Sequence, residues 1–298
     1  MQFPDPVLSE IVLDSSTDSN CLCCFVNQMT NSLVNTGSQP GVTVLLASYG
    51  RLEYLKDAVN SALNQRYSNF EILIVDDGSE DEVIEWLRFL ESSESRVSVY
   101  YQSHQGVAAA RAKGLEKAKT DLVCILDSDD RLSQYALETL VAVMDRNEDI
   151  QLVFTNIREI RANGEAAIRR YSQYESTQAM IMATLLKPRV PFKHSGTLFR
   201  RHTALKLGSY DVNLPCKVDV DLYLKFLKAG YLPEHVDQPL VDFRMHKNSV
   251  SIDRLTGIRV WLYLINRYGP ENPVYRFFIK TVRISAELLK RVYVEIHG

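Results

Sequence analysis

Short apolar segments alternate along the first half of the chain with longer segments in which apolar residues recur at helical spacing. The short segments are Val42–Leu46, Ile72–Val75 and Leu122–Leu126. They are apolar at nearly every position, which is typical of strands buried on both faces of a parallel sheet. The pattern therefore predicts three strands at the centre of an α/β sheet.

The segments between these strands carry the 3.6-residue period of helices. Their apolar positions are Leu55, Ala58, Val59, Ala62 and Leu63, then Val83, Ile84, Leu87 and Leu90, and then the stretch from Val107 to Ala118. Strand and helix thus alternate from Val42 to Phe154. This alternation predicts βαβ units with right-handed crossovers and a mostly parallel sheet flanked by helices on both faces.

Two acidic clusters follow two of the predicted strands. They are Asp76-Asp77-Gly78-Ser79 and Asp127-Ser128-Asp129-Asp130. Ligands of such sheets bind where the strands end, and carboxylates gathered there stay ionised only if a cation or a hydrogen-bonded ligand compensates them. Hard cations such as Mg²⁺ and Mn²⁺ commonly take one or two carboxylates and complete their shell with substrate phosphates. The clusters therefore predict a divalent cation and a polar ligand.

A structural interpretation of the second cluster is a cap on a following helix. The apolar face of that helix would be Leu137, Leu140, Val141 and Met144, with Asp130 as its N-cap. One cap does not require three acids, so we expect Asp130 to cap while Asp127 and Asp129, on one side of an extended segment, approach the ligand.

These residues resemble the nucleotide-sugar-dependent family 2 glycosyltransferases of the GT-A fold. The resemblance runs from Val42 to about Ile150, and more loosely to about Ser251. It rests on four elements in the order and spacing of the family: Val42 to Arg51, Gln65 to Ser79, Gly106 to Arg111, and Asp127 to Asp130. It implies a Rossmann-like GT-A sheet, a donor site at the carboxyl edge of its strands, and Mn²⁺ or Mg²⁺ as cofactor.

The resemblance also assigns residues to the donor. It implies that Tyr49 packs near the nucleobase, that Asp77 hydrogen-bonds the base, and that Ala47 lines the same pocket. The expected donor-binding residues are Ala47, Tyr49, Arg51, Asp77, Arg111, Asp127 and Ser128, and the expected metal ligands are Asp127, Asp129 and His246. Arg111 suits a phosphate because its guanidinium is planar and permanently charged.

Catalysis is expected from the second half of the chain. The segment Lys217–Leu224 is similar to the family's Glu-Asp-x-Asp-Leu, with Val218 where the Glu usually stands. On this alignment Asp219 is the general base, although Asp219 or Asp221 could instead cap the helix that follows. The implied reaction is inverting transfer from a nucleotide sugar, UDP-linked by resemblance, to a hydroxyl of a glycan or lipid-linked acceptor in surface polysaccharide synthesis.

Composition is that of an ordinary globular protein. Charged residues make up 24% of the chain, hydrophobic residues 46%, and the formal net charge is −3, so we expect no nucleic-acid partner. No apolar stretch approaches the roughly 18 residues that span a bilayer. We expect a cytoplasmic location, with reduced thiols at the cluster Cys21, Cys23 and Cys24.

Three regions follow from these patterns. Residues 1–40 are a polar extension that we expect to be partly disordered. Residues 41–252 form the glycosyltransferase domain, with a nucleotide-sugar half at 41–155 and an acceptor half at 156–252. Residues 253–298 form a basic, aromatic helical tail.

The tail has two interpretations. Val282, Ala286, Leu289 and Val292 or Tyr293 outline an amphipathic helix that could rest on the inner face of an anionic membrane. It could equally pack on the catalytic domain and leave its charges in water. Its aromatic residues also make an oligomer contact conceivable.

Other functions remain open at this stage. A non-catalytic sugar-nucleotide-binding or scaffold protein would keep Asp77 and the fold but lose the base, and Val218 is compatible with that. A nucleotidyltransferase shares the sheet and the metal, but the turn Ser48–Arg51 offers little of its Gly-rich basic loop. A phospho-receiver domain would not explain the second half of the chain.

Overall fold

The computed structural model describes residues 41–187, 189–245 and 254–297. The chain divides into two units, residues 1–39 and residues 40–298, and all described residues belong to the second. The expectations for the N-terminal extension, its cysteine cluster and His246 lie outside the described residues.

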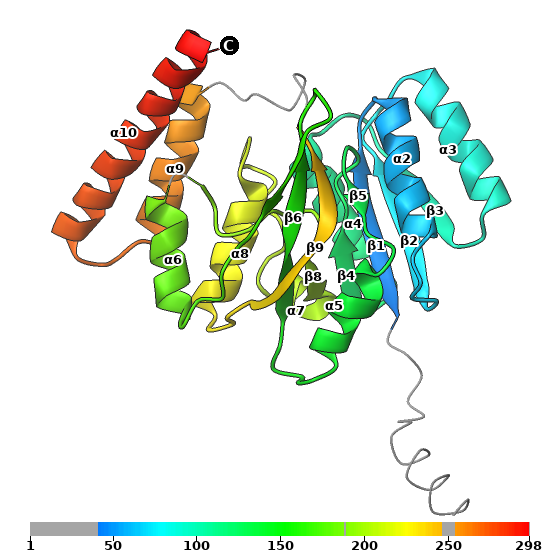
Figure 1. The fold of residues 1–298 in the computed structure, drawn as a ribbon, viewed down its shortest axis with the longest axis horizontal. Coiled ribbons are helices and arrows are strands. Elements are labelled where there is room, and N and C mark those ends of the chain that lie inside the picture. Colours follow the sequence, from blue (N-terminus) through cyan, green and yellow to red (C-terminus); the bar gives the residue numbers. More distant parts are fainter. Residues whose placement is uncertain (1–40, 188, 246–253, 298) are drawn as a thin grey trace, which may run out of the picture. The chain divides into compact units, whose positions relative to one another are not determined.

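The first half is built as the alternation of strands and helices predicts (Figure 1). Its elements are β1 (Val42–Ser48), α2 (Leu52–Leu63), β2 (Phe70–Asp76), α3 (Asp81–Ser93), β3 (Val97–Tyr101), α4 (Val107–Lys117) and β4 (Leu122–Ile125). The strands lie in the order β3-β2-β1-β4 and pair in parallel. The predicted helices and strands of this half are confirmed.

The second half extends the same sheet with mixed strand directions. Its elements are β5 (Arg131–Leu132), α5 (Ala136–Met144), β6 (Leu152–Ile160), β7 (Ala166–Arg169), α6 (Thr177–Leu186), β8 (Leu198–Arg200), α7 (Arg201–Lys206), α8 (Val218–Lys228) and β9 (Glu234–Arg244). The order continues β4-β8-β6-β9-β5. Strand β8 runs antiparallel to β4 and β6, whereas β6 and β9 are parallel.

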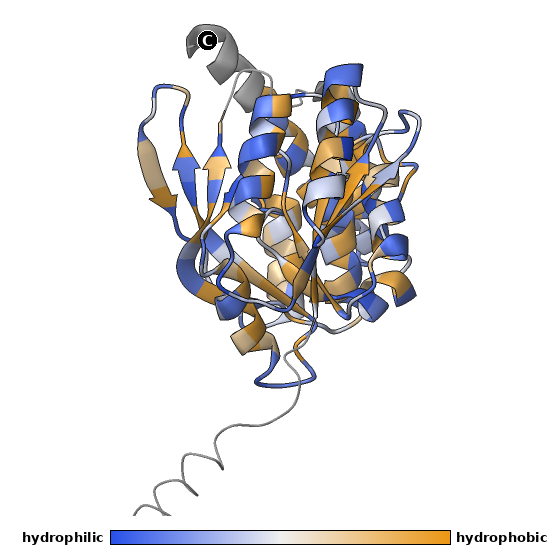
Figure 2. Cartoon of the chain, turned by 90° about the vertical axis from the view of Figure 1, so that its right-hand side faces the viewer, coloured by the Kyte–Doolittle hydropathy of each residue, from blue (hydrophilic) through white to orange (hydrophobic). Residues whose placement is uncertain are grey.

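Two hydrophobic cores cover the two faces of the sheet. Because side chains alternate along a strand, Leu45 of β1 faces the core that holds α4, α6, α8 and α9, while Val44 and Leu46 face the core that holds α2, α3 and α5. In Figure 2 the strands between the helices are coloured largely as hydrophobic. Burial on both faces explains the continuous apolar runs of the sequence.

The register of the parallel strands brings their carboxyl ends to one edge. Ser48 of β1 is opposite Asp76 of β2, and the Asp77 amide donates to the Ser48 carbonyl at 2.8 Å. The Leu126 amide donates to the Leu45 carbonyl at 3.0 Å. Both acidic clusters therefore lie at the same edge of the sheet, as predicted.

The chain after the second cluster differs from the prediction. Asp130 does not cap α5, whose N-cap is Tyr135. The residues after Asp130 first form β5, which pairs antiparallel with β9, and this delays the helix by several residues. The Asp130 carboxylate instead accepts a hydrogen bond at 3.0 Å from the backbone amide of Arg244 at the end of β9.

The tail forms two helices that lie side by side, α9 (Arg254–Tyr268) and α10 (Pro273–His297) (Figure 1). Helix α9 buries Trp261, Leu264, Ile265 and Tyr268 in the core, which fits the second of the two interpretations of the tail. No helix of the described residues is long and apolar enough to cross a membrane.

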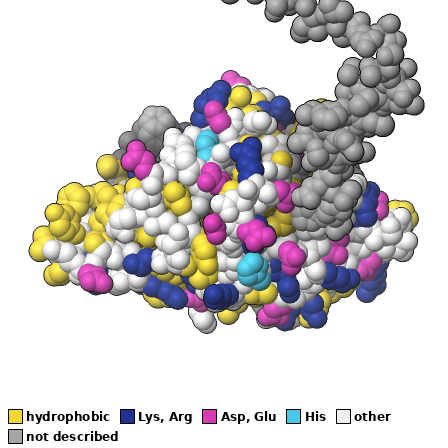
Figure 3. Space-filling view, turned by 90° about the horizontal axis from the view of Figure 1, so that it is seen from below, with side chains coloured by type: hydrophobic (Ala, Val, Ile, Leu, Met, Phe, Trp, Pro, Cys, Tyr) yellow, Lys and Arg dark blue, Asp and Glu magenta, His cyan; other side chains and the backbone are white. Residues whose placement is uncertain are grey.

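Helix α10 presents an apolar face to solvent. Val282 and Ala286 of the predicted face are half-buried, whereas Leu289 is 69% exposed. Among the residues of α10 whose burial is described, 273–289, the exposed large apolar ones are Val274, Tyr275, Phe277, Phe278, Leu288 and Leu289. Figure 3 shows hydrophobic side chains gathered at the side of the molecule where Figure 1 places α9 and α10.

Candidate active site

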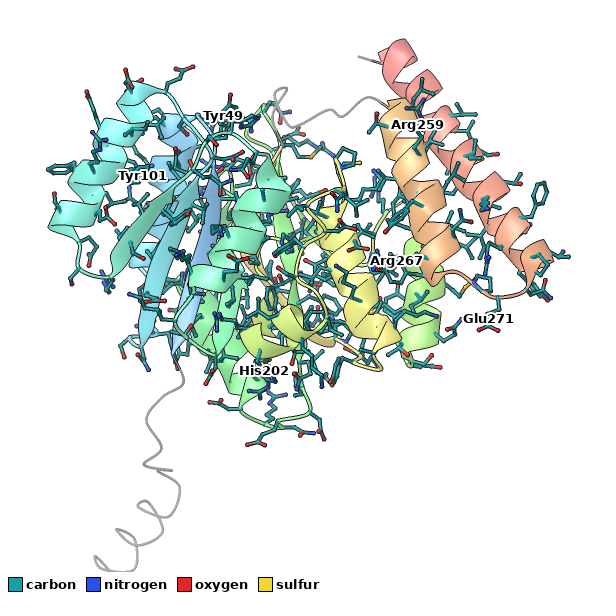
Figure 4. All side chains as sticks on the ribbon, turned by 180° about the vertical axis from the view of Figure 1, so that it is seen from behind. Tyr49, Tyr101, His202, Arg259, Arg267 and Glu271 are labelled. Carbon is teal, nitrogen blue, oxygen red and sulfur yellow. The ribbon has the colours of Figure 1, made fainter. Side chains whose placement is uncertain are left out.

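The turn after β1 is shaped by two residues in left-handed conformations. Gly50 has φ 63° and Arg51 has φ 53°, and the Gly50 amide donates to the Ser79 hydroxyl at 2.9 Å. This turn leaves Tyr49 57% exposed. Figure 4 shows Tyr49 near the ends of the strands. It also lets the Arg51 guanidinium lie 3.1 Å from the Asp129 carboxylate.

The first acidic cluster is held by local hydrogen bonds. The Asp76 carboxylate is buried and accepts from the Gly78 amide at 3.2 Å, from the Ser79 amide at 3.0 Å, and from the Ser79 hydroxyl. Such bonds from an Asp to the backbone two and three residues later stabilise a tight turn. Asp76 therefore shapes the loop after β2.

Asp77 is bound by the loop between β3 and α4. Its Oδ1 accepts from the Gln102 side-chain amide at 2.7 Å and from the Gln105 backbone amide at 2.8 Å. Its Oδ2 accepts from the Gly106 amide at 2.8 Å and lies 2.9 Å from Nδ1 of His104. Because a carboxylate offers about four acceptor positions, these donors occupy its capacity. The predicted hydrogen bond from Asp77 to a nucleobase stays a prediction.

His104 is a site residue that the sequence reasoning did not find. Its ring centroid lies 4.3 Å from that of Tyr49, with an interplanar angle of 31°. The contact follows from the Asp77 contacts, which hold the loop over the turn after β1. Tyr49 and His104 thus form an exposed pair of rings against which a planar base can stack.

The second acidic cluster is paired with two arginines. Asp127 accepts a hydrogen bond from Arg111 of α4, and Asp129 lies 3.1 Å from Arg51. All four side chains are less than one third exposed. The expected donor residues Arg51, Arg111, Asp127 and Ser128 therefore come together at the edge of the sheet, close to Ala47 at the end of β1 and to Tyr49 in the turn that follows.

The charges of this cluster act strongly on one another. Burial raises the pKa of Asp127, the Arg111 guanidinium opposes that shift, and the charges of Asp129 and Asp219 add to it. Burial opposes protonation of Arg111, but the charges of Asp127, Tyr210 and Asp219 raise its pKa overall. A positive ligand group or a cation would relieve the repulsion among the carboxylates.

Asp130 and Arg244 hold this cluster in place. Burial and the charges of Asp127 and Asp129 raise the pKa of Asp130 well above its usual range. The Arg244 guanidinium donates to the Asp129 carbonyl, to the Asp57 carboxylate at 2.6 Å and to the Tyr54 carbonyl at 3.1 Å. Arg244 thus ties the end of β9 to α2 and to the acidic loop. The sequence analysis assigned a role to His246, two residues later, and did not identify the role of Arg244.

Asp219 shares the electrostatic environment of the acidic cluster. It lies half-buried in the first turn of α8, and its charge raises the pKa values of Arg111 and Asp127. The N-cap of α8 is Lys217, so the capping interpretation of Asp219 and Asp221 is wrong. No described residue donates a hydrogen bond to the Asp219 carboxylate, which leaves it available to a ligand.

Asp221 has a structural role instead. It is fully buried, lies 2.9 Å from the Lys225 ammonium and accepts from the Tyr268 hydroxyl at 2.7 Å. These contacts join α8 to α9. The two aspartates of the Lys217–Leu224 segment are thereby separated: one is tied into the core and the other faces the site.

A neutral buried network lies beside Asp219. The two ring nitrogens of His194 contact the hydroxyls of Tyr223 and Tyr210, the latter at 2.9 Å. Burial and the charge of Arg111 lower the pKa of His194 well below its usual value. Burial is also the main cause that raises the pKa values of both tyrosines. The network is therefore uncharged at neutral pH.

The acidic cluster has the oxygen donors that a hard cation takes. No group of three or more His, Cys, Asp or Glu side chains within the described ranges could hold a metal ion by itself. Asp127 and Asp129 fit the smaller protein share of one or two carboxylates that Mg²⁺ and Mn²⁺ use with substrate phosphates. The expected third ligand, His246, lies outside the described residues.

Comparison with known proteins agrees with this fold. The family model described as Glycosyl transferase family 2 matches residues 43–208, more than half of the chain and most of the sheet. The chain belongs to glycosyl transferase family 2. It is a glycosyltransferase with an α/β fold of the GT-A type, as the resemblance in the sequence implies.

Relatives of this glycosyltransferase differ in length. It is 27% identical over 236 residues to the putative teichuronic acid biosynthesis glycosyltransferase TuaG of Bacillus subtilis, covering 74% of this chain and 84% of that protein. An uncharacterised glycosyltransferase of Haemophilus influenzae is 37% identical over 111 residues. The match covers 37% of this chain and 44% of that protein. The hyaluronan synthase of Pasteurella multocida is 24% identical over 216 residues. The match covers 72% of this chain and 22% of that enzyme.

Solved structures share the fold of this glycosyltransferase. S. aureus TarS residues 1–349 in complex with UDP-GlcNAc superimposes with a TM-score of 0.63 at 16% identity, covering 83% of this chain and 72% of that one. The mannosyltransferase PcManGT of Pyrobaculum calidifontis, in complex with GDP-Man and Mn²⁺, gives 0.60 at 14% identity, covering 93% and 83%. At these identities the likeness concerns the fold.

Proposed function

We propose that this glycosyltransferase moves a sugar from a UDP-sugar to a hydroxyl of a glycan or lipid-linked acceptor, with inversion and with a divalent cation, in surface polysaccharide synthesis. One observation carries the proposal: Asp127 and Asp129, two arginines and an exposed ring pair lie at one sheet edge, in electrostatic range of Asp219. The names of TuaG and of hyaluronan synthase support the pathway, and the UDP-GlcNAc complex of TarS supports the donor.

On the donor side, we infer that Tyr49 and His104 stack on the base beside Ala47. Asp77 holds His104 in that place through the loop of residues 102–106. Arg51 and Arg111 lie at the carboxylates near which the diphosphate must bind, and their guanidinium groups suit phosphate oxygens. Uridine is the base we expect, although PcManGT shows the fold with a guanosine donor.

Asp127 and Asp129 would hold Mn²⁺ or Mg²⁺. When bound, the ion supplies Lewis acidity that offsets the charge of the leaving diphosphate. Arg51 and Arg111, which pair with these carboxylates in the structure, would then turn toward the phosphate oxygens. Asp130, buried behind them, fixes the loop through the backbone of Arg244.

Asp219 acts as the general base in this proposal. It takes the proton of the acceptor hydroxyl while the hydroxyl oxygen attacks the anomeric carbon, the bond to the diphosphate breaks, and no covalent enzyme intermediate forms. General base catalysis is typically worth 10² to 10⁴ in rate. Burial and the charge of Arg111 lower the pKa of the neighbouring His194, which makes its imidazole a poor competitor for the proton.

The donor site is tested by thermal-shift binding of UDP, GDP and their sugars, each with and without Mn²⁺. We expect one nucleotide to stabilise the wild-type protein only in the presence of Mn²⁺, and we expect Asp129→Asn to lose this Mn²⁺-dependent stabilisation. Glu138→Gln, the matching change at an exposed carboxylate of α5, is the control. Stabilisation by no nucleotide would contradict the donor site.

The base is tested by Asp219→Asn with the donor found in that panel. We expect turnover to fall at least about 100-fold while the midpoint shift by nucleotide and Mn²⁺ stays unchanged. Nearly full turnover in this variant would show that Asp219 is not the base. Hydrolysis of the donor in the wild-type protein, measured in the same assay, separates a catalyst from a binding protein.

For the acceptor, we propose that α10 rests on an anionic membrane in which lipid-linked acceptors lie. Residues 273–297 contain five Lys or Arg and two Asp or Glu, and Phe277 and Leu289 are 72% and 69% exposed. An amphipathic helix with such residues binds lipid through apolar burial and attraction to anionic headgroups. Phe277→Ser combined with Leu289→Ser should abolish sedimentation with vesicles rich in phosphatidylglycerol, and absence of sedimentation of the wild-type protein at low salt would contradict the proposal.

A further inference from the structure

Lys193 is a cation that the proposed reaction does not yet use. It lies in the loop between α6 and β8, one residue before the neutral His194 network. Its ammonium lies 4.1 Å from the centroid of the Phe243 ring, and Phe243 pairs with Glu159 where β9 and β6 run side by side. This places Lys193 at the ends of β6 and β9.

The carboxylates around Lys193 leave it without an ion pair. Four charges act on it, those of Asp219, Arg169, Asp130 and Glu159. The Glu159 carboxylate pairs with Arg169 at 2.6 Å, and the Asp130 carboxylate accepts a hydrogen bond from the backbone amide of Arg244 at 3.0 Å. No carboxylate of the described residues lies within 4.0 Å of its nitrogen, and the ring of Phe243 lies against the charge.

A half-buried ammonium without a carboxylate partner is costly, because its hydration is reduced and no opposite charge replaces it. Burial accordingly lowers the pKa of Lys193, and the charge of Asp219 opposes that shift. A ligand that brings an oxyanion would supply the missing partner. Lysine also suits this task because its ammonium has three donors that can rotate toward the ligand.

Lys193 lies away from the groups proposed to bind the donor. The proposed donor groups, Arg51 and Arg111, lie at the ends of β1 and on α4, and β8 separates β4 from β6 in the sheet. Lys193 lies on the β6 side of β8. Of the negative charges that act on it, that of Asp219, the proposed base, acts most strongly. The diphosphate already has two guanidinium groups of its own.

We propose that Lys193 and Phe243 form an acceptor subsite for an oxyanion, a carboxylate or a phosphate, carried near the hydroxyl that Asp219 deprotonates. The proposal rests on the function proposed above and deepens it by naming the class of acceptor. The methylene stem and the Phe243 ring also offer an apolar surface for a sugar ring, while the ammonium selects the charge.

The test compares ligands that differ only in charge. Wild-type protein saturated with UDP and Mn²⁺ is titrated calorimetrically with 4-nitrophenyl β-D-glucuronide and with the neutral 4-nitrophenyl β-D-glucoside. Glucose 6-phosphate and glucose form the second pair, which distinguishes a phosphate from a carboxylate. We expect one charged member to bind about tenfold more tightly than its neutral partner, as one charge-assisted contact allows.

Three variants complete the experiment. Lys193→Met should remove the preference for the charged ligand and leave the binding of the neutral ligand unchanged, whereas Lys193→Arg should keep the preference. Lys228→Met, the same change at an exposed position of α8, should change neither. A second readout is the affinity for UDP with Mn²⁺, which should be equal in all four proteins.

The outcomes separate this subsite from the proposed function. Equal binding of charged and neutral ligands by the wild-type protein, or no binding of either, would overturn the subsite. A preference that survives in Lys193→Met would do the same, as would a loss of UDP affinity in that variant, because Lys193 would then serve the donor. Failure of the wild-type protein to bind any nucleotide with Mn²⁺ would instead contradict the donor site.

Discussion

Replacing Asp77 by asparagine tests whether this carboxylate holds the loop that carries His104. The new side-chain amide would keep one acceptor oxygen for Gln102 and Gln105. Its NH₂ group would replace the oxygen that now accepts from the Gly106 amide at 2.8 Å and lies 2.9 Å from His104. Donor groups would then face one another in a buried place, since Asp77 is 3% exposed.

The size of the effect follows from these two lost contacts. A hydrogen bond to a charged group contributes about 1.5–3 kcal/mol net, so two of them give about 3–6 kcal/mol. Opening of the loop of residues 102–106 relieves part of this cost, and the lower figure of about 3 kcal/mol is therefore expected. A typical domain has about 5–15 kcal/mol of stability, so the variant should remain folded.

The assay is native-state hydrogen exchange combined with urea unfolding. A loss of about 3 kcal/mol should accelerate exchange of the Gly106 and Gln105 amides roughly 100-fold, and the Tyr49–His104 ring pair should loosen with it. Asp81→Asn, the same change at an exposed position of α3, is the matched control. Unchanged Gly106 exchange in Asp77→Asn would refute the reasoning, because the loop would then not depend on this carboxylate.

Two further predictions concern stability. The pKa of His194 is lowered well below its usual value, chiefly by burial, so the unfolded chain binds a proton that the folded chain does not. The free energy of unfolding should therefore fall as the pH drops below about 6.5, by up to about 1.4 kcal/mol per pH unit. His194→Gln should flatten this pH dependence in urea unfolding measured from pH 5 to 8. The same pH dependence in the variant and the wild-type protein would contradict the prediction. Gly114→Ala should destabilise by about 1–3 kcal/mol, because its Cβ would lie 2.2 Å from Leu45. Gly257→Ala in α9, which meets only the Lys217 ammonium at 3.6 Å, should be neutral or stabilising by up to about 1 kcal/mol in the same unfolding assay.

The first half of the fold could be predicted because local patterns determine it. Continuous apolar runs mark strands buried on both faces, and the parallel register then brings the residues after β1, β2 and β4 to one edge without further information. Arg51 and Arg111 were expected near the donor because of the family resemblance. Their ion pairs with Asp129 and Asp127 were not predicted.

The parts that were missed depend on contacts far apart in the sequence. Nothing near Asp130 in the sequence indicates that the backbone amide of Arg244, over 100 residues later, donates a hydrogen bond to its carboxylate. A helix cap was therefore the better local explanation. The His104 ring reaches Tyr49 only because Asp77 organises the loop between β3 and α4. A signal for His104 was present, since it is the one ring in a polar loop that follows an edge strand.

A buried arginine joins α10 to α9 and to the end of α6. Arg283 of α10 is 2% exposed, its guanidinium lies 3.4 Å from the centre of the Trp261 ring, and it donates to the carbonyl of Lys187. Burial lowers its pKa to about 10, which leaves it protonated at neutral pH. Lys187 precedes Lys193 by six residues, so α10 contacts the chain close in sequence to the proposed oxyanion subsite. If the tail binds a membrane surface, its contact with the domain is therefore close in sequence to the residues proposed to select the acceptor.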